Sequence, residues 1–185
     1  MTSTPATRFT ASGAGSAADV HVVGGGALLT AVERAAAAVQ PSAPAVCVVP
    51  RIPARAPLAE LSDARLSEEI GDALDETLAA VQQELAFLRG GRLVFVLPPG
   101  PLMAASGYAG ASAVTNGVLS MARTLAIELA HDSVTVNVLA IDTVGTELPG
   151  ALAGQLAALL GPGGQHITGQ EIYLTAGSDL GRLRP

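Results

Sequence analysis

The chain has 185 residues, of which 49% are hydrophobic and 14% charged, and it carries a net charge of −6. This length suits one domain, and the negative charge argues against the basic surface that nucleic-acid binding requires. All 10 basic residues are Arg, so chemistry that needs a lysine amine is excluded from this chain. The single cysteine, Cys47, excludes an internal disulfide and favours a reducing cytoplasm.

Residues 1–18 are rich in Ser, Thr, Ala and Gly, with Arg8 as their only charge. They lack the continuous apolar segment of a secretory signal. We expect a disordered tail here, with a transit peptide as the alternative, followed by one domain over 19–185. The uncharged run 93–122 has the length of a membrane span, but the sequence PPGP interrupts it, so we expect no membrane segment.

Apolar runs alternate with helical patterns along the rest of the chain. The runs are apolar at every position, which is typical of strands buried on both faces of a sheet. The longest helix is predicted to begin after Ser62 as N-cap and to end before two glycines. Strands are predicted over 19–25, 45–50, 92–98, 134–140 and 169–177, and helices over 27–39, 61–89, 109–130 and 148–161. This alternation predicts an α/β fold with a parallel sheet.

Two segments carry a family resemblance. The sequence LAIELAHDSVTVNVLAIDTVGT is similar to a helix end followed by the motif VNxVxPG…T, and ITGQEIYLTAG is similar to the ending ITGQ…VDGG. Both motifs belong to short-chain dehydrogenases/reductases, and the order of elements over 45–177 resembles that family. The resemblance implies a Rossmann-like, doubly wound parallel sheet, incomplete at its N-terminal, cofactor-binding half. Family positions are kept at Asn137, Thr146, Thr168, Gly169, Gln170 and Gly177, while Ile141 and Asp142 replace a Pro-Gly pair.

The catalytic positions of the family are occupied by residues without the required chemistry. Counting back from LAIELA places the family Lys at Thr115, its Tyr at Ala111 and its Ser at Pro98. A slip of three residues would bring Tyr108 into register, but the fourth residue is then Ser112 rather than Lys. In the family the Tyr transfers a proton, with its pKa lowered from about 10 by the Lys charge. The resemblance therefore implies no catalytic residue in this chain.

The cofactor site is equally altered. The only glycine cluster, in VVGGGALL, lacks the G-x-x-x-G-x-G spacing that holds a pyrophosphate in the family. Only residues 40–44 separate the following helix from the strand over 45–50, where the family has at least one further strand and helix. The family motif NNAG falls on Val48, Val49, Pro50 and Arg51, and its next Asn falls near Ala73. We expect that NAD(P) does not bind productively.

Other site chemistry is not favoured by the sequence. The three His residues and Cys47 lack the spacing of metal ligands, so we expect no metal. His131, Asp132 and Ser133 are adjacent and are expected at a helix-to-strand turn. The acidic cluster over 63–76 is expected to be a solvated helix face, with an interface role for part of it as the alternative.

The remaining resemblance is to parts that the family uses for assembly. The helix over 109–130 is apolar or small almost all round, so we expect it to meet the sheet on one side and a partner on the other. The chain resembles the non-catalytic subunit of paired ketoreductases, such as those of aminocoumarin antibiotic biosynthesis. This implies a hetero-oligomer with an active short-chain reductase that supplies NADP, acting on a substrate held by a carrier protein. The interface residues expected from this resemblance are Val114, Val118, Met121, Ala122, Leu125, Tyr173, Arg182 and Arg184.

Two other classes stay open. The degenerate pocket could house a new activity that uses Tyr108, His131 or Asp142, or the chain could be a homodimeric binding module without a catalytic partner.

Overall fold

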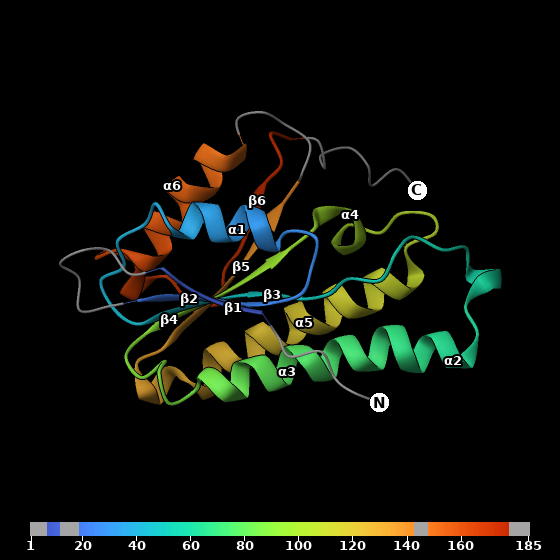
Figure 1. Ribbon diagram of the computed structural model, residues 1–185, viewed down its shortest axis with the longest axis horizontal. Helices are drawn as coiled ribbons and strands as arrows, with labels where there is room; N and C mark the ends of the chain where they lie inside the picture. The colour runs from blue at the N-terminus through green and yellow to red at the C-terminus, as the bar shows by residue number, and fades with distance from the viewer. Residues whose placement is uncertain (1–6, 12–18, 143–147, 178–185) are drawn as a thin grey trace.

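The protein is built on one sheet of six strands. The computed structural model describes residues 7–11, 19–142 and 148–177, and Figure 1 shows the sheet between two layers of helices. The strand order follows the chain from β1 to β6. The strands are β1 (Thr7–Ala11), β2 (Val20–Gly24), β3 (Ala45–Val49), β4 (Arg92–Leu97), β5 (Thr135–Ile141) and β6 (Glu171–Leu174). Strands β2 to β6 are parallel, which confirms the predicted α/β fold.

The first strand corrects an expectation. Residues 1–18 were expected to form a disordered tail, but Thr7–Ala11 pair antiparallel with β2. The segment TRFTA contains two Thr and a Phe, which suit a strand. Its pairing covers an edge of β2 that would otherwise expose unpaired backbone groups. Residues 1–6 and 12–18 lie outside the described part of the chain.

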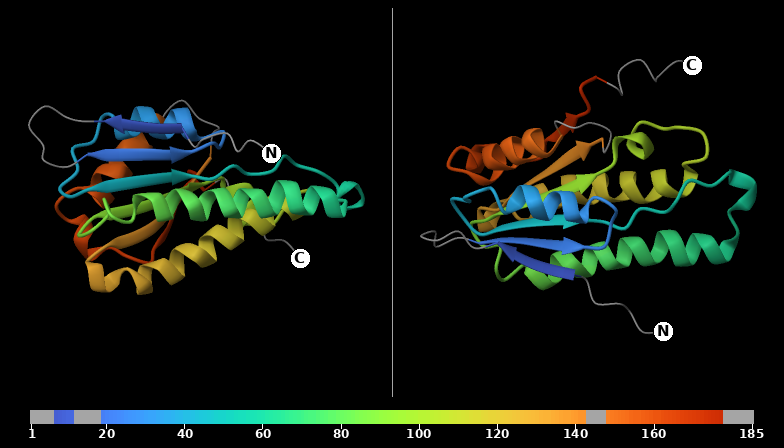
Figure 2. Two further views of the ribbon diagram at one scale, coloured as in Figure 1. Left: turned by 60° about the horizontal axis from the view of Figure 1, so that its bottom comes forward. Right: turned by 45° about the horizontal axis from the view of Figure 1, so that its top comes forward.

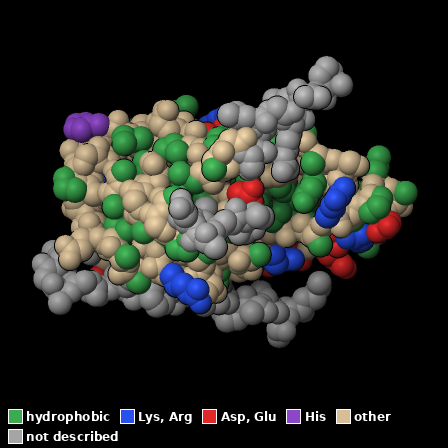
Figure 3. Space-filling model, turned by 90° about the horizontal axis from the view of Figure 1, so that it is seen from above, with side chains coloured by type: hydrophobic (Ala, Val, Ile, Leu, Met, Phe, Trp, Pro, Cys, Tyr) green, Lys and Arg blue, Asp and Glu red, His purple; other side chains and the backbone are tan. Residues whose placement is uncertain are grey.

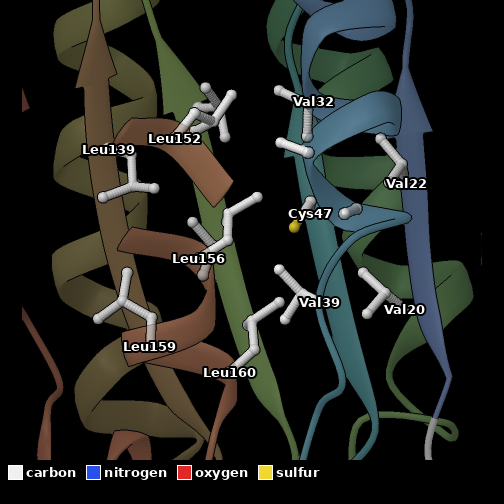
Figure 4. Close-up of a cluster of buried hydrophobic side chains, with 14 of the residues drawn as sticks. Val20, Val22, Val32, Val39, Cys47, Leu139, Leu152, Leu156, Leu159 and Leu160 are labelled. Carbon is white, nitrogen blue, oxygen red and sulfur yellow. The ribbon is translucent and has the colours of Figure 1, made fainter. Parts of the chain in front are cut away.

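Two pairs of helices cover the two faces of the sheet. Helices α1 (Leu29–Ala36) and α6 (Leu148–Leu160) contact each other on one face, and α3 (Asp72–Glu84) and α5 (Ala109–Glu128) lie side by side on the other (Figures 1 and 2). Each face has its own core. Figure 4 shows part of the first, in which Leu152 and Leu156 of α6 belong to one cluster with Cys47 and Val22 of the sheet and Val32 of α1. The second core is centred on Phe95, packed among side chains from α3 and α5.

The face of α1 and α6 carries little charge. Helix α6 has the sequence LPGALAGQLAALL, without a charged residue. Figure 3, which looks onto this face, shows mainly hydrophobic and uncharged atoms, with the densest group of charged side chains at its right end.

The crossovers between the parallel strands are of mixed hand. All four connections advance in the same direction across the sheet, yet α1 and α6 lie on one face and α3 and α5 on the other. Crossovers in one direction on opposite faces have opposite hands, so one pair is left-handed, although about 98% of such connections are right-handed. The chain leaves β2 and β3 toward opposite faces, and β4 and β5 likewise. In a doubly wound sheet the ligand crevice lies where the strand order reverses, and the strand order of this sheet follows the chain without a reversal.

The predicted helix over 61–89 is confirmed in its position, but its extent and its regularity differ from the prediction. Ser62 is the N-cap and its hydroxyl accepts from the N–H of Arg65 at 3.3 Å, as expected. The helix contains a π-helical segment, η2 (Leu66–Gly71), between α2 (Asp63–Arg65) and α3, which ends at Glu84. Short helical turns complete the fold: η1 (Leu58–Glu60), α4 (Pro99–Leu102), η3 (Ala130–Asp132) and η4 (Gly164–His166). Within the described residues, the helices are too short or too polar to cross a membrane.

Candidate functional site

The three family catalytic positions lie where β4 leads through α4 into α5. Ala111 and Thr115 are 1% and 0% exposed in the first turns of α5. The hydroxyl of Thr115 donates to the carbonyl of Ala111, one turn earlier, at 3.0 Å. Pro98 is half-buried and precedes α4. A hydroxyl turned into its own helix, a methyl group and a pyrrolidine ring provide neither an available proton donor nor a charge at these three positions.

Tyr108 lies next to these positions but is held by the loop after β3. It immediately precedes α5 and is half-buried. The guanidinium of Arg55 lies 5.6 Å from its ring centre and donates to the carbonyl of Ser106 at 3.0 Å. Ser112, which takes the Lys position in the slipped register, donates its hydroxyl to Pro101 at 2.8 Å. These contacts fix the loop, and the cation next to Tyr108 is the guanidinium of Arg55 over its ring rather than a lysine ammonium.

The glycine turn after β2 is closed by backbone. The N–H groups of Gly25 and Gly26 both lie against the carbonyl oxygen of Val49, at 3.2 and 3.3 Å. A Cβ added at Gly24 would collide with the same oxygen, and one at Gly26 with the carbonyl of Pro50. Such N–H groups hold a phosphate when they point to an open crevice. Here they satisfy the end of β3.

The residues after β3 also differ in chemistry from a cofactor site. Arg51 forms two hydrogen bonds with Glu76 of α3, both at 3.2 Å, so its charge is compensated. Ala73, at the position of the family Asn, is 0% exposed and packs in the core. The Ala73 methyl group offers no hydrogen bond, and the Arg51 guanidinium is engaged by Glu76.

The family-like residues that are kept hold the β5–β6 region together. Asn137 is 2% exposed; its Nδ2 donates to the carbonyl of Ile167 at 2.7 Å and its Oδ1 accepts from the N–H of Gln170 at 3.1 Å. The hydroxyl of Thr168 accepts from the N–H of Val136 at 3.1 Å. Gly169 has φ +69° and donates to Val136 at 2.7 Å. Thr146 lies outside the described residues.

The predicted interface residues fall into three groups. Val114, Val118 and Ala122 are 0%, 0% and 2% exposed and pack in the core, which corrects the expectation that they face a partner. Because α5 is small or apolar on most sides, its periodicity does not mark which side faces the sheet. Met121 and Leu125 are half-buried.

Tyr173 is also half-buried, on the edge strand β6. Its hydroxyl donates to Glu171, which accepts from Arg123 of α5 at 3.0 Å. Arg182 and Arg184 lie outside the described residues. The exposed positions of α5 before Met121 are Ala109, Ala113, Asn116 and Ser120, so this side is small and polar rather than broadly apolar.

The residues considered for a new activity do not assemble. Tyr108 immediately precedes α5, and Asp142 follows the carboxyl end of β5. His131 lies after the C-terminal end of α5. A helix of this length separates its ends by about 30 Å. His131 is exposed and lies 3.3 Å from Asp132.

Two further features belong to the fold rather than to a site. The Nδ1 of His21, whose pairing the sequence did not indicate, lies 2.7 Å from a carboxylate oxygen of Glu84 in a buried hydrogen bond, and the His21 ring stacks on Phe87. Across the described residues, no three His, Cys, Asp or Glu side chains form a metal-binding group.

Comparison with solved structures identifies the architecture. A dehydrogenase/reductase from Sinorhizobium meliloti 1021 is similar with TM-score 0.62 and 21% identity over 71% of this chain. The fold is that of short-chain dehydrogenases/reductases. An oxidoreductase of that family from Burkholderia thailandensis matches with TM-score 0.59 and 25% identity over 71% of the chain. Acetoin dehydrogenase from Enterobacter cloacae matches with TM-score 0.65 and 16% identity over 76%.

The likeness is partial. This chain covers 62%, 63% and 67% of the three proteins in that order, so it spans less than two thirds of the first two. In total 1409 chains match, which shows how common this architecture is and how little it says about one activity. No protein-family model and no curated protein matches the sequence.

Proposed function

We propose that the chain is a non-catalytic, short-chain-reductase-like subunit that assembles with and supports an active NADP-dependent ketoreductase or β-hydroxy dehydrogenase. The observation that carries the proposal is the division between kept and replaced residues. Asn137 and Thr168 hold backbone across the β5–β6 region, while the catalytic positions hold Pro98, Ala111 and Thr115. A subunit of this kind needs the scaffold and not the proton-transfer groups.

The closed glycine turn supports the cofactor part of the proposal. Its N–H groups point at the carbonyl of Val49, and Arg51 is paired with Glu76. NADP would have to displace these contacts, so we assign the cofactor to the partner, together with the Tyr and Lys. By analogy with the paired ketoreductases the sequence resembles, we place the complex in secondary-metabolite biosynthesis in the cytoplasm, acting on a carrier-bound substrate.

Co-purification tests this function. The tagged chain is co-expressed with full-length short-chain reductases of its own genome, and NADPH-dependent ketone reduction is measured for each reductase with and without it. We expect one reductase to co-purify at fixed stoichiometry and to gain activity or stability in the complex. Separate purification of every candidate, each fully active alone, would exclude the partner role and leave a homodimeric binding module or a new activity.

A further inference from the structure

The amino ends of β4 and β5 carry two buried polar side chains whose hydrogen-bonding capacity is not filled. Arg92 and Thr135 are the first residues of the two strands, are register partners, and are each 6% exposed. The Nε of Arg92 and the hydroxyl of Thr135 are buried and form no hydrogen bond with any residue that the structure describes. Buried polar atoms are nearly always hydrogen-bonded, so an exception at two neighbouring side chains points to a ligand.

The side chains of Arg92 and Thr135 lie on the sheet face that α1 and α6 cover. Side chains alternate between the two faces along a strand, and the next residues, Leu93 and Val136, belong to the core on the other face. The carbonyl of Gly91 brings the two groups together. It accepts from the N–H of Thr135 at 3.2 Å and from Nη1 of Arg92 at 2.9 Å, so the guanidinium lies beside Thr135.

The guanidinium of Arg92 is engaged on one side only. Nη1 donates to the carbonyls of Gly90 at 3.1 Å and Gly91 at 2.9 Å. Nε and Nη2 form the other edge of the planar group, and neither donates to a residue within the described ranges. Nε is sealed from solvent, whereas Nη2 is not. This edge presents two parallel N–H bonds, the geometry that binds a carboxylate through both of its oxygens.

The charge of Arg92 has no counter-charge in the described part of the chain. The ion pairs there involve other residues, and burial is the cause that lowers the pKa of Arg92. Asp132, whose carbonyl accepts from the N–H of Gly90 at 2.9 Å, has its carboxylate 3.3 Å from His131. A buried charge without a partner is unfavourable, so a bound anion would stabilise this end of the sheet.

The surroundings favour an anion with a single charge. The N–H of Arg92 donates to Pro44 at 2.8 Å, and the N–H of Ser42 donates to Leu160, the last residue of α6, at 2.9 Å. The C-terminal end of α6 therefore lies close to Arg92, and the C-terminal end of a helix carries partial negative charge. One guanidinium next to such a helix end balances a carboxylate better than a doubly charged phosphate.

We propose that Arg92 and Thr135 bind the carboxylate of a small molecule at the amino ends of β4 and β5. Nε and Nη2 of Arg92 donate to the two carboxylate oxygens, and the hydroxyl of Thr135 donates to one of them. Nη2 is where the carboxylate makes its first contact, and a local shift of side chains then opens Nε and the hydroxyl. The glycine turn follows the carboxyl end of β2, at the opposite edge of the parallel sheet, so this site is separate from the proposed function and does not rest on it.

Titration of the full chain with sodium acetate tests the site. The signal of the Arg92 Nε–H, assigned by its loss in Arg92→Lys, is followed by nitrogen-15 NMR while sodium chloride keeps the ionic strength constant. We expect a saturable shift with a Kd of about 1–10 mM, and binding of inorganic phosphate at least about tenfold weaker. A shift that does not saturate would overturn the site, and tighter binding of phosphate would overturn the assignment to a carboxylate.

Thr135→Val separates binding from a structural role. It removes a hydroxyl without a partner, so the urea midpoint should stay equal or rise, while acetate binding should weaken at least about fivefold. Arg92→Lys keeps the charge but not the planar edge, and acetate binding measured by the shift of the Val136 N–H should weaken at least about tenfold. The matched control is Arg89→Gln, an exposed Arg of the same turn, which should retain wild-type binding. Unchanged binding in Thr135→Val, or equal losses in Arg92→Lys and Arg89→Gln, would overturn the proposal.

Discussion

Two junctions of the fold differ in what their side chains bind. One lies between β5 and β6, and the other lies between β4 and α5. At the first, Asn137 and Thr168 hydrogen-bond backbone on both sides of the loop. At the second, Ala111 and Thr115 are buried, and the Thr115 hydroxyl bonds within its own helix, to the Ala111 carbonyl. This difference is what the proposed non-catalytic function requires, since such a subunit needs side chains that hold backbone and needs none that move a proton.

A substitution in the glycine turn should have the largest effect on the free energy of unfolding. A small effect would show that the turn is an open loop able to bind a ligand. Gly24 has φ +127°, and a Cβ there would collide with the carbonyl of Val49. Gly24→Ala should lower the free energy of unfolding by about 4 kcal/mol, measured by urea denaturation. Gly25→Ala, with nothing within 4 Å of the added Cβ, is the matched control and should change it by less than about 1 kcal/mol. Equal tolerance of both substitutions would show that the turn is not closed.

The stability losses on substitution of Asn137 and of Thr115 compare the two junctions directly. Asn137→Ala removes a buried amide and leaves the Ile167 carbonyl and the Gln170 N–H without it, so we expect a loss of about 3 kcal/mol. Thr115→Val removes a hydroxyl whose acceptor, the Ala111 carbonyl, also lies within reach of helix backbone, so the loss should stay within about 1 kcal/mol. Thermal and urea unfolding of both variants provide the comparison, and the reverse order of effects would contradict it.

Cys47, in the core on the α1 and α6 face of the sheet, provides an effect that appears only at high pH. Burial raises the pKa of its thiol from 9.0 to about 12. The unfolded chain therefore loses this proton at lower pH than the folded chain, and stability falls as pH rises from about 9 toward 12, by up to about 1.4 kcal/mol per pH unit. In Cys47→Ala this part of the slope should vanish. An unchanged slope would show that other groups carry it.

The fold could be predicted from sequence because its strands are buried on both faces. Continuous apolar runs such as AVCVV and RLVFVL mark β3 and β4 almost to the residue. The assignment of the family Ser, Tyr and Lys positions to Pro98, Ala111 and Thr115 comes from counting back from the end of α5, and it stays a prediction. The roles of Asn137 and Thr168 needed the structure, because a motif does not reveal which backbone groups a side chain binds.

The errors have physical causes. β1 is a short edge strand whose pairing partner, rather than its own pattern, determines its conformation. Val114, Val118 and Ala122 were assigned to the surface because a helix of small and apolar residues has no clear polar side to orient it.

Titration of the isolated chain with NADPH tests the central claim most directly. Isothermal titration calorimetry, with the co-purifying reductase as positive control, measures the affinity of each protein alone. We expect this chain to bind NADPH with a Kd weaker than about 1 mM, because the N–H groups of the glycine turn already bind Val49. A micromolar Kd for this chain by itself would show that the crevice opens to the cofactor and would contradict a subunit that depends on its partner for NADPH.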